Sequence, residues 1–154
     1  MALRPASERD VGAIMAIERA SFPTDAWSEA TMRSTLTDRD AVAELAEVDE
    51  AVAGYAALLA PIGAPDADVL TIAVDAAYRG RGVGRALLTR LLDAAARRGA
   101  RRVFLEVRAD NPVARALYES EGFTAVGRRP RYYQPDDVDA IVMRVELAER
   151  GAAA

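Results

Sequence analysis

The segment Arg79–Gly84 places three glycines between a predicted strand and a long predicted helix. Glycine lets the backbone turn tightly and come close to a ligand. The first amide N–H groups of a helix have no partner inside it, and the helix dipole favours an anion beside them. Arg79, Arg81 and Arg85 add positive charge around this loop. The spacing predicts a site for a phosphate or pyrophosphate that is bound mainly by the backbone.

Two alternatives compete for this loop. A dinucleotide site needs G-x-G-x-x-G, but Gly82 and Gly84 are followed by Leu87 where the third glycine would stand. Glu106 could serve as the ribose-binding acid of such a site, yet predicted antiparallel hairpins precede the loop. The second alternative is a glycine-rich turn with solvated arginines, because short glycine motifs give many false matches.

Glu106 is the best candidate for acid–base chemistry. It lies within the apolar run Val103–Val107, which predicts a strand, and it shares a face with Phe104. A carboxylate in such a strand costs free energy unless it is partnered or hydrated. Two roles would explain Glu106 at this position: it acts as a general base, or it forms a structural ion pair with Arg108 or another arginine.

The missing residue types exclude several kinds of enzyme. The chain has no Cys, His or Lys, so all 20 basic residues are Arg. This excludes a thiol nucleophile, a Cys/His zinc site, a Schiff-base lysine, a histidine base and a P-loop NTPase. Acid–base chemistry falls to Asp, Glu, Tyr or Ser, and we expect no metal.

The net charge of -4 indicates no nucleic-acid partner. The run Arg128–Tyr133 could be a basic, aromatic RNA-binding strip, but exposed arginines on alternate strand faces are the favoured interpretation. Residues 1–10 show no signal peptide, and the longest uncharged run, Ala51–Pro65, is broken by Gly and Pro and too short to span a membrane. We therefore expect no membrane partner and a cytoplasmic protein.

The 154 residues suit one domain, predicted at residues 1–150 with a flexible tail at 151–154. Because 34 of the apolar residues are alanine, the core must come from fewer Leu, Val, Ile and aromatic positions. Periodicity predicts a mixed α/β domain. Its strands are expected at 2–5, 41–48, 51–60, 67–74, 103–107, 123–133 and 138–147, and its helices at 7–22, after Ser28, at 83–98 and at 112–121.

The glycine loop also carries a family resemblance. Arg79-x-x-Gly82-x-Gly84 resembles the acetyl-CoA signature (Gln/Arg-x-x-Gly-x-Gly/Ala) of GNAT N-acetyltransferases, and the order of predicted elements matches that fold throughout. Four further stretches resemble the RimI subgroup, the ribosomal-protein N-terminal alanine acetyltransferases: Leu105–Asn111, Ala116–Glu119 with Gly122-Phe123, Arg131–Tyr133 and Asp139–Met143. The resemblance implies an α/β GNAT fold with a mixed, mostly antiparallel central sheet flanked by helices.

The resemblance implies acetyl-CoA as co-substrate and direct attack of an amine on its thioester. The backbone of one strand would hold the pantetheine arm, with the Val74 N–H as a one-donor oxyanion hole. The cofactor-binding residues it implies are Ile72, Ala73, Val74, Arg79, Arg81, Gly82, Val83, Gly84, Arg85, Ala86, Asn111 and Tyr118.

Two catalytic roles follow from the same resemblance. Glu106 matches the general base of the RimI subgroup, and Tyr118 matches the acid that protonates the leaving thiolate. A packing role for Tyr118, with water as the acid, is the alternative. Asn111 could simply cap the following helix.

The resemblance also implies an acceptor site formed by Trp27, Glu106, Tyr132 and Tyr133. RimI-like sequences show Phe-Pro-x-Pro-Trp-Ser around the tryptophan, whereas Phe22–Ser28 is one residue longer and lacks the second proline. An α-amine, with a pKa near ~8, is about one-tenth neutral at pH 7, so it is an easier acceptor than a lysine.

Three functions remain open from the sequence. The first is an N-α-acetyltransferase acting on a protein N-terminus, with alanine and a small-subunit ribosomal protein expected. The second is a GNAT enzyme for a small-molecule amine, and the third a non-catalytic acyl-CoA sensor. A monomer or weak dimer is expected.

Overall fold

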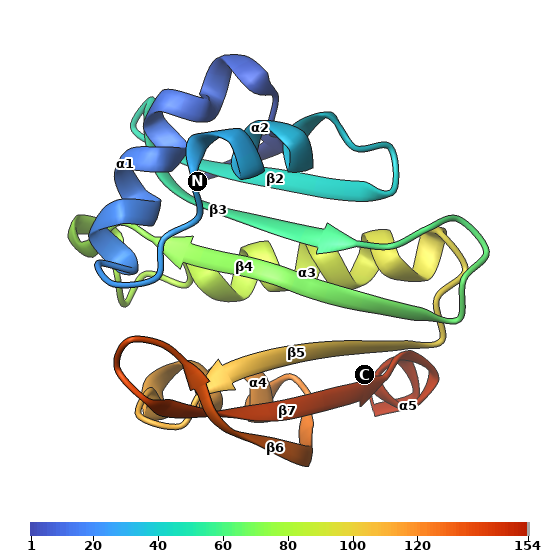
Figure 1. Cartoon of the computed structure of the whole chain (residues 1–154). Helices are drawn as coiled ribbons and strands as arrows, with labels where there is room; N and C mark the ends of the chain where they lie inside the picture. Colours follow the sequence, from blue (N-terminus) through green and yellow to red (C-terminus); the bar gives the residue numbers. More distant parts are fainter. Residues whose placement is uncertain (154) are drawn as a thin grey trace.

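The computed structural model describes residues 1–153, and side chains as far as residue 150. Its centre is one seven-stranded sheet in which only β4 and β5 pair in parallel, so the predicted mixed, mostly antiparallel sheet is confirmed (Figure 1). In spatial order the strands are β1 (Ala2–Pro5), β2 (Ala41–Val48), β3 (Ala51–Leu59), β4 (Asp66–Val74), β5 (Arg102–Arg108), β7 (Val138–Glu146) and β6 (Thr124–Tyr133).

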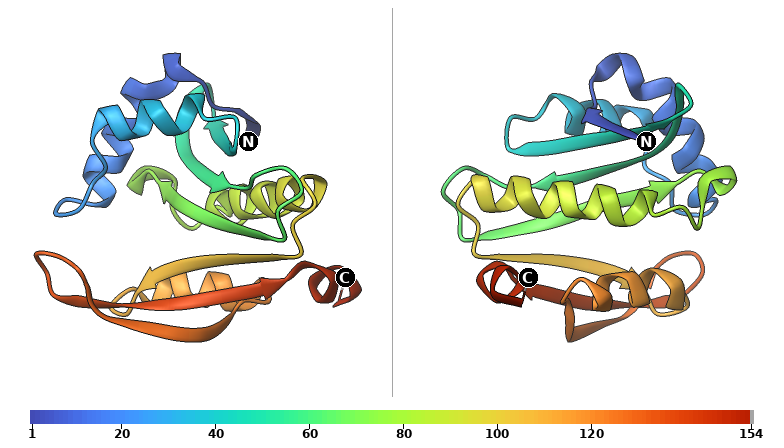
Figure 2. Two further views of the ribbon diagram at one scale, coloured as in Figure 1. Left: turned by 45° about the vertical axis from the view of Figure 1, so that its right-hand side comes forward. Right: turned by 180° about the vertical axis from the view of Figure 1, so that it is seen from behind.

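Helices cover both faces of the sheet (Figure 2). The helices are α1 (Val11–Ser21), α2 (Glu29–Thr37), α3 (Val83–Arg97), α4 (Pro112–Ser120) and α5 (Leu147–Ala153), with 3-10 turns at Glu8–Asp10 and Ala76–Tyr78. α1 and α2 lie on one face, while α3 and α4 lie on the other. Within the part of the chain described, no helix is long and apolar enough to cross a membrane.

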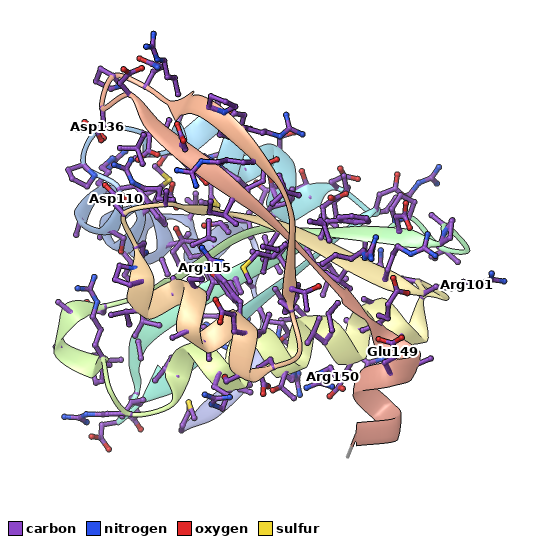
Figure 3. All side chains as sticks on the ribbon, turned by 90° about the horizontal axis from the view of Figure 1, so that it is seen from below. Arg101, Asp110, Arg115, Asp136, Glu149 and Arg150 are labelled. Atoms are coloured by element: carbon purple, nitrogen blue, oxygen red, sulfur yellow. The ribbon has the colours of Figure 1, made fainter. Side chains whose placement is uncertain are left out.

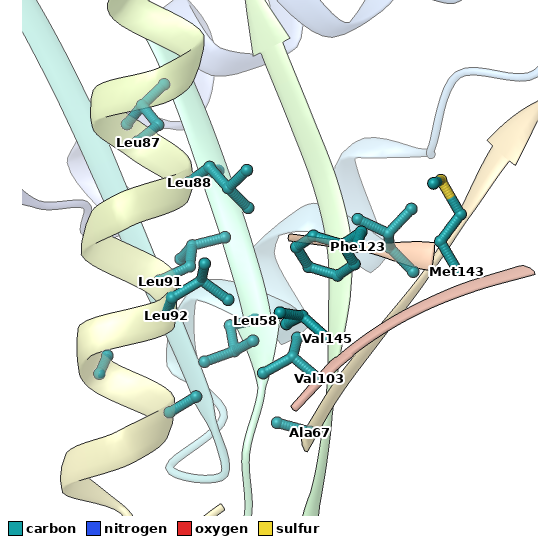
Figure 4. Packing of buried hydrophobic residues seen from close by; sticks show 14 of the residues in the cluster. Leu58, Ala67, Leu87, Leu88, Leu91, Leu92, Val103, Phe123, Met143 and Val145 are labelled. Atoms are coloured by element: carbon teal, nitrogen blue, oxygen red, sulfur yellow. The ribbon is translucent and has the colours of Figure 1, made fainter. Parts of the chain in front are cut away.

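The core consists of one apolar cluster on each face. The α3 leucines, which include Leu87 and Leu91, pack towards Val103, Phe123 and Val145 (Figure 4). The opposite cluster joins α1 and α2 to the sheet through Ile14, Met15, Met32, Leu45 and Tyr55. Two clusters arise because neighbouring strand residues point to opposite faces.

Three predicted helix ends are confirmed, whereas the helix expected from residue 7 starts as the 3-10 turn Glu8–Asp10 and is α-helical only from Val11. Ser28 Oγ accepts a hydrogen bond from the Thr31 amide at 3.1 Å, and Asn111 Oδ1 accepts one from the Ala114 amide at 3.1 Å. Gly99, with φ +95°, follows α3 and supplies the positive φ common after a helix.

The C-terminal helix α5 was not predicted. The backbone of residues 151–153, expected as a flexible tail, is part of this helix, and residue 154 lies outside the described residues. The alanine-rich sequence favours a helix here. The domain boundary at residue 150 stays a prediction.

The pairing of β4 with β5 extends over only three residues of each strand, from Asp66–Asp68 to Arg102–Phe104. The strands then diverge (Figure 1). In the pairing with β3, Val69 and Thr71 face consecutive residues, so Leu70 is an extra residue in β4. Such a bulge bends its strand. The two strands therefore enclose a wedge that opens towards their carboxyl ends.

Candidate active site

Two adjoining cavities occupy this wedge. The inner cavity, about 180 Å³, reaches α4 and is lined by Ile72, Asn111, Ala114 and Tyr118 among others. The outer cavity, about 870 Å³, lies on the side of the β6–β7 hairpin. Seven residues line both: Asp25, Trp27, Val69, Leu70, Leu105, Glu106 and Tyr133. Glu106 therefore lies where the two cavities meet.

Glu106 is half-buried on the face of β5 that the sequence predicted. Its Oε1 lies 3.4 Å from Arg129 Nε, so an arginine other than Arg108 is its ion-pair partner. Its Oε2 is buried and has no hydrogen-bond partner among the described residues. A buried carboxylate oxygen that no protein group satisfies is free to accept a proton or hydrogen bond from a ligand.

Tyr118 lies on α4 with its ring 6.0 Å from that of Phe123, centroid to centroid. Burial raises the pKa of its hydroxyl to about 12. The phenol is therefore protonated at neutral pH and can donate a hydrogen bond into the inner cavity. This position suits either of its predicted roles.

The glycine loop has the backbone that the sequence predicted. Gly80 and Gly82 have φ values of +78° and +81°, and a Cβ at either would meet no protein atom within 4 Å. Glycine is needed here for the backbone conformation, and the space beside it is open. Gly82 is the N-cap of α3, and its carbonyl accepts from the Ala86 amide. The amides from Val83 to Arg85 precede the first intrahelical donor and have no partner within the helix, as an anion site requires. The Ala86 amide, which was also expected to bind the cofactor, is instead engaged by the Gly82 carbonyl as the first bond of the helix.

The three arginines of the loop differ in their contacts. Arg85 Nη1 lies 3.0 Å from Glu121 Oε2, so its charge is shared with that carboxylate. The Arg81 guanidinium lies over the Tyr78 ring at 5.5 Å, and Arg79 Nε donates to the Val74 carbonyl at 3.3 Å. Arg79 and Arg81 are thus the stronger sources of positive potential at the loop.

The backbone of β4 supplies donors at the wedge. The Asp75 amide donates to the Ala53 carbonyl of β3 at 2.8 Å. Because successive amides of a strand point to opposite edges, those of Val74 and Ile72 point towards the wedge and that of Ala73 towards β3. The predicted oxyanion donor, Val74, therefore has an amide directed at the open edge.

The predicted acceptor residues come together at the outer cavity. Tyr132 and Tyr133 lie edge to face with ring centroids 5.2 Å apart, opposite Trp27. The charge of Glu106 raises the pKa of Tyr132, so that hydroxyl stays protonated beside the carboxylate. Both tyrosines and Trp27 are therefore placed to contact a ligand that reaches Glu106.

Sequence reasoning missed Glu18. This carboxylate is only 1% exposed, accepts from the Trp27 amide at 2.9 Å and from the Tyr55 hydroxyl, and lines the inner cavity. The available signal was a glutamate beside Ile14 and Ile17 on the apolar side of a predicted helix. Glu18 holds the backbone of Trp27 in place.

The arginines of the proposed RNA-binding strip are paired with carboxylates. Arg128 lies 2.6 Å from Asp139, Arg129 contacts Glu106, and Arg131 lies 3.8 Å from Asp137. These pairs favour the interpretation as exposed strand residues. Among the described residues, no group of three or more acidic side chains could hold a metal ion.

Comparison with known proteins places this geometry in a family. N-alpha-acetyltransferase RimI of Mycobacterium tuberculosis is 57% identical over 77 residues, which cover 50% of this chain and 47% of that protein. The chain spans about half the length, or less, of the mycobacterial relatives that it matches. The [ribosomal protein bS18]-alanine N-acetyltransferase of Escherichia coli K12 is 38% identical over 130 residues, covering 83% of this chain and 84% of the relative.

The crystal structure of the Escherichia coli ribosomal-protein-S18-alanine N-acetyltransferase superposes with a TM-score of 0.84 at 33% identity, covering 95% of this chain and 93% of that one. The model of the acetyltransferase (GNAT) family matches residues 12–123. With its splayed β4 and β5 and its glycine loop before α3, this chain belongs to the GNAT acetyltransferase family.

Proposed function

We propose that the protein is an acetyl-CoA-dependent N-α-acetyltransferase that acetylates the N-terminal amine of a protein. The observation that carries the proposal is the position of Glu106 where the inner and outer cavities meet, together with Trp27 and Tyr133. GNAT enzymes use acetyl-CoA. The inner cavity would take the thioester end of the acetyl donor and the outer cavity the amine.

The loop and the wedge fit this donor. The unpaired amides at the start of α3 suit a pyrophosphate, and the open space beside Gly80 and Gly82 lets it approach the backbone. The amides of Ile72 and Val74 offer hydrogen bonds to an extended pantetheine arm. Asn111 lies at the inner cavity and also caps α4, and this position supports a contact with the donor in addition to the cap.

The reaction proposed is a direct transfer. The neutral amine attacks the thioester carbonyl carbon, and the oxyanion that forms is stabilised by the Val74 amide. The C–S bond then breaks and the thiolate of coenzyme A leaves. Glu106 takes the proton lost by the amine, directly or through water, and the Tyr118 hydroxyl donates to the thiolate.

An α-amine at an N-terminal alanine is the acceptor we propose, in a small-subunit ribosomal protein. Relatives named as acetyltransferases of ribosomal protein bS18 alanine support this assignment. A single carboxylate is enough for an amine that is already about one-tenth neutral at pH 7. The open outer cavity, about 870 Å³, has room for the first residues of a peptide.

The test is incubation of the full chain with acetyl-CoA and either peptides that begin with alanine or a panel of small amines. Acetylation of the peptides supports the proposal. Turnover of small amines without any peptide product would favour the small-molecule alternative. Tight binding of acetyl-CoA without turnover of any amine would favour the sensor.

A further inference from the structure

Arg108, the last residue of β5, contacts three carboxylates. Its Nε and Nη2 donate to the two oxygens of Asp110 at 3.0 and 3.1 Å. Its Nη2 also lies 3.1 Å from Asp136 Oδ2 in the β6–β7 turn, and its Nη1 lies 3.9 Å from Asp25 Oδ2 in the α1–α2 loop. The guanidinium lies over the Tyr133 ring at 5.3 Å. One cation thus joins segments that are far apart in the sequence.

The α1–α2 loop and the β6–β7 turn also touch directly. Thr24 Oγ1 donates a hydrogen bond to Asp136 Oδ2 at 2.7 Å, the same oxygen that Arg108 contacts. Figure 3 shows Asp110 and Asp136 at one end of the molecule. We call the residues that make these contacts between the loop, the turn and β5 the polar bridge: Thr24, Asp25, Arg108 and Asp136.

The polar bridge joins the two walls of the outer cavity. Asp25 lines both cavities, and Trp27 follows it by two residues on one wall. On the other wall, Tyr133 precedes Asp136 by three residues and also lines both cavities. The separation of these two aromatic side chains therefore depends on whether the loop and the turn stay together.

Two residues of the polar bridge lie in the segment whose sequence departs from the RimI-like pattern. Thr24 and Asp25 stand within Phe22–Ser28, the segment that is one residue longer and lacks the second proline. These two residues make the contacts to the hairpin turn. This acceptor wall is therefore held by polar contacts that belong to the longer loop.

Arg108 is the central residue of the polar bridge because of its positive charge. Three carboxylates surround one guanidinium, and without it they would repel one another. The side chains of Arg108, Asp25 and Asp136 are 22%, 24% and 34% exposed, so water screens these pairs less than fully exposed ones. The hydrogen bonds that Arg108 donates to Asp110 raise the pKa of Arg108, so the cation persists.

We propose that Arg108 is a positioning residue for the acceptor: through the polar bridge it fixes the two walls of the outer cavity and so sets the affinity for the peptide. The inference rests on the proposed function, because it concerns the acceptor of that reaction. Arg108 also lines the inner cavity, but its guanidinium is engaged with Asp25, Asp110 and Asp136, so it acts on the acceptor through them, and Glu106 remains the base.

The experiment measures steady-state kinetics of the full-length Arg108→Gln variant with an N-terminal alanine peptide and acetyl-CoA. We expect the peptide KM to rise about tenfold. The kcat should change less than about twofold and the KM for acetyl-CoA should not change. Arg108→Lys keeps the charge without the planar fork and should restore part of the loss.

Two milder variants guard against misfolding. Asp136→Asn and Thr24→Ala alter exposed or partly exposed members of the bridge and should raise the peptide KM in the same direction by smaller factors. Asp137→Asn is the matched control. It makes the same change in the same turn, but Asp137 pairs with Arg131 and is outside the bridge, so the peptide KM should stay at the wild-type value.

The inference is overturned if the peptide KM of Asp136→Asn and of Thr24→Ala equals that of the wild type. This holds whether Arg108→Gln also has the wild-type peptide KM or fails to fold. So does a fall in kcat with equal rises in both KM values, since that reports a general structural role. Wild-type protein that acetylates no N-terminal peptide overturns the proposed function first, and the inference falls with it. Wild-type turnover with insensitive variants overturns the inference alone.

Discussion

Arg129 Nε, on the edge strand β6, lies 3.4 Å from Glu106 Oε1 on the central strand β5, while the second oxygen of that carboxylate is buried and unpaired among the described residues. The arginine is 57% exposed, so its side chain can yield to a ligand in the outer cavity. One oxygen of Glu106 is thus held by the protein, and the other is the one that would take the proton of the amine in the reaction we propose.

Replacing Glu106 by glutamine keeps the shape of the side chain and removes its basicity. We expect kcat at neutral pH to fall about 100-fold or more, the usual contribution of a general base. Part of the activity should return as the pH rises and more of the amine is deprotonated. Steady-state kinetics over pH 6–10 measure both effects.

The matched control is Glu119→Gln, an exposed glutamate of α4 that pairs with Arg115 away from both cavities. It should retain wild-type turnover. Equal rates for Glu106→Gln and the wild type would remove Glu106 from the mechanism.

The glycine loop allows a test in which backbone strain and ligand binding are separated. Gly82 and Gly63 have similar φ values, +81° and +84°, and a Cβ at either meets no atom within 4 Å. Alanine at either position should therefore lower the free energy of unfolding by a similar amount, about 1 kcal/mol. Only Gly82→Ala should also weaken acetyl-CoA binding, since its Cβ enters the space before α3.

Denaturant unfolding and calorimetric titration with acetyl-CoA measure these two quantities. Equal acetyl-CoA affinities for Gly82→Ala and Gly63→Ala would show that the loop does not hold the donor.

Burial of Tyr118 links its ionisation to stability at high pH. Its pKa is raised to about 12 in the folded protein, above the ~10 of an exposed tyrosine. The protonated hydroxyl of Tyr118 therefore stabilises the folded protein fully below pH ~10, and this contribution is lost as the pH rises from about 10 to 12. Tyr118→Phe should lose less stability than the wild type over that interval, by roughly 2 kcal/mol at its upper end.

Unfolding by guanidinium at pH 9 and pH 12 measures the difference. If the leaving thiolate takes its proton from this hydroxyl, kcat of Tyr118→Phe at pH 8 also falls at least tenfold. An unchanged kcat would assign the acid role to water and leave Tyr118 as a packing residue.

At low pH, the ionisation of Asp10 is linked to the stability of the folded protein. Its hydrogen bonds from Arg4 lower its pKa to about 2, and the side chain is 8% exposed. The ionised Asp10 carboxylate therefore stabilises the folded protein above pH ~4, and this contribution is lost as the pH falls towards 2. Asp10→Asn should lower the free energy of unfolding at pH 7 by about 2 kcal/mol and flatten its dependence between pH 4 and 2.

Thermal unfolding at pH 7, 4 and 2 checks this expectation. A pH dependence that is the same in Asp10→Asn and the wild type would contradict it.

The sequence predicted the strands and most helices because their signals are local. Alternation marks β5, leucines at helical spacing mark α3, and Ser28 and Asn111 cap the helices that follow them. The divergence of β4 from β5 could not be derived from residue patterns, since it depends on where the pairing ends and on the extra residue Leu70.

The site was predicted less completely than the fold. Glu106 stood out as a carboxylate in an apolar strand, whereas Glu18 lay in an ordinary amphipathic helix. The partner of Glu106 was open between Arg108 and other arginines, and the choice of Arg129 depends on how β5, β7 and β6 are ordered in the sheet. Contacts between distant segments, such as Thr24 with Asp136, leave no local pattern.

Transfer to an α-amine is tested most directly by locating the acetyl group on a peptide that offers both an α-amine and a lysine amine. A peptide with an N-terminal alanine and an internal lysine is incubated with the protein and acetyl-CoA, and fragment masses locate the product. We predict acetyl on the alanine α-amine alone, with the product strongly reduced for Glu106→Gln. Acetyl on the lysine, or no acetylated peptide where small amines are acetylated, would contradict this prediction.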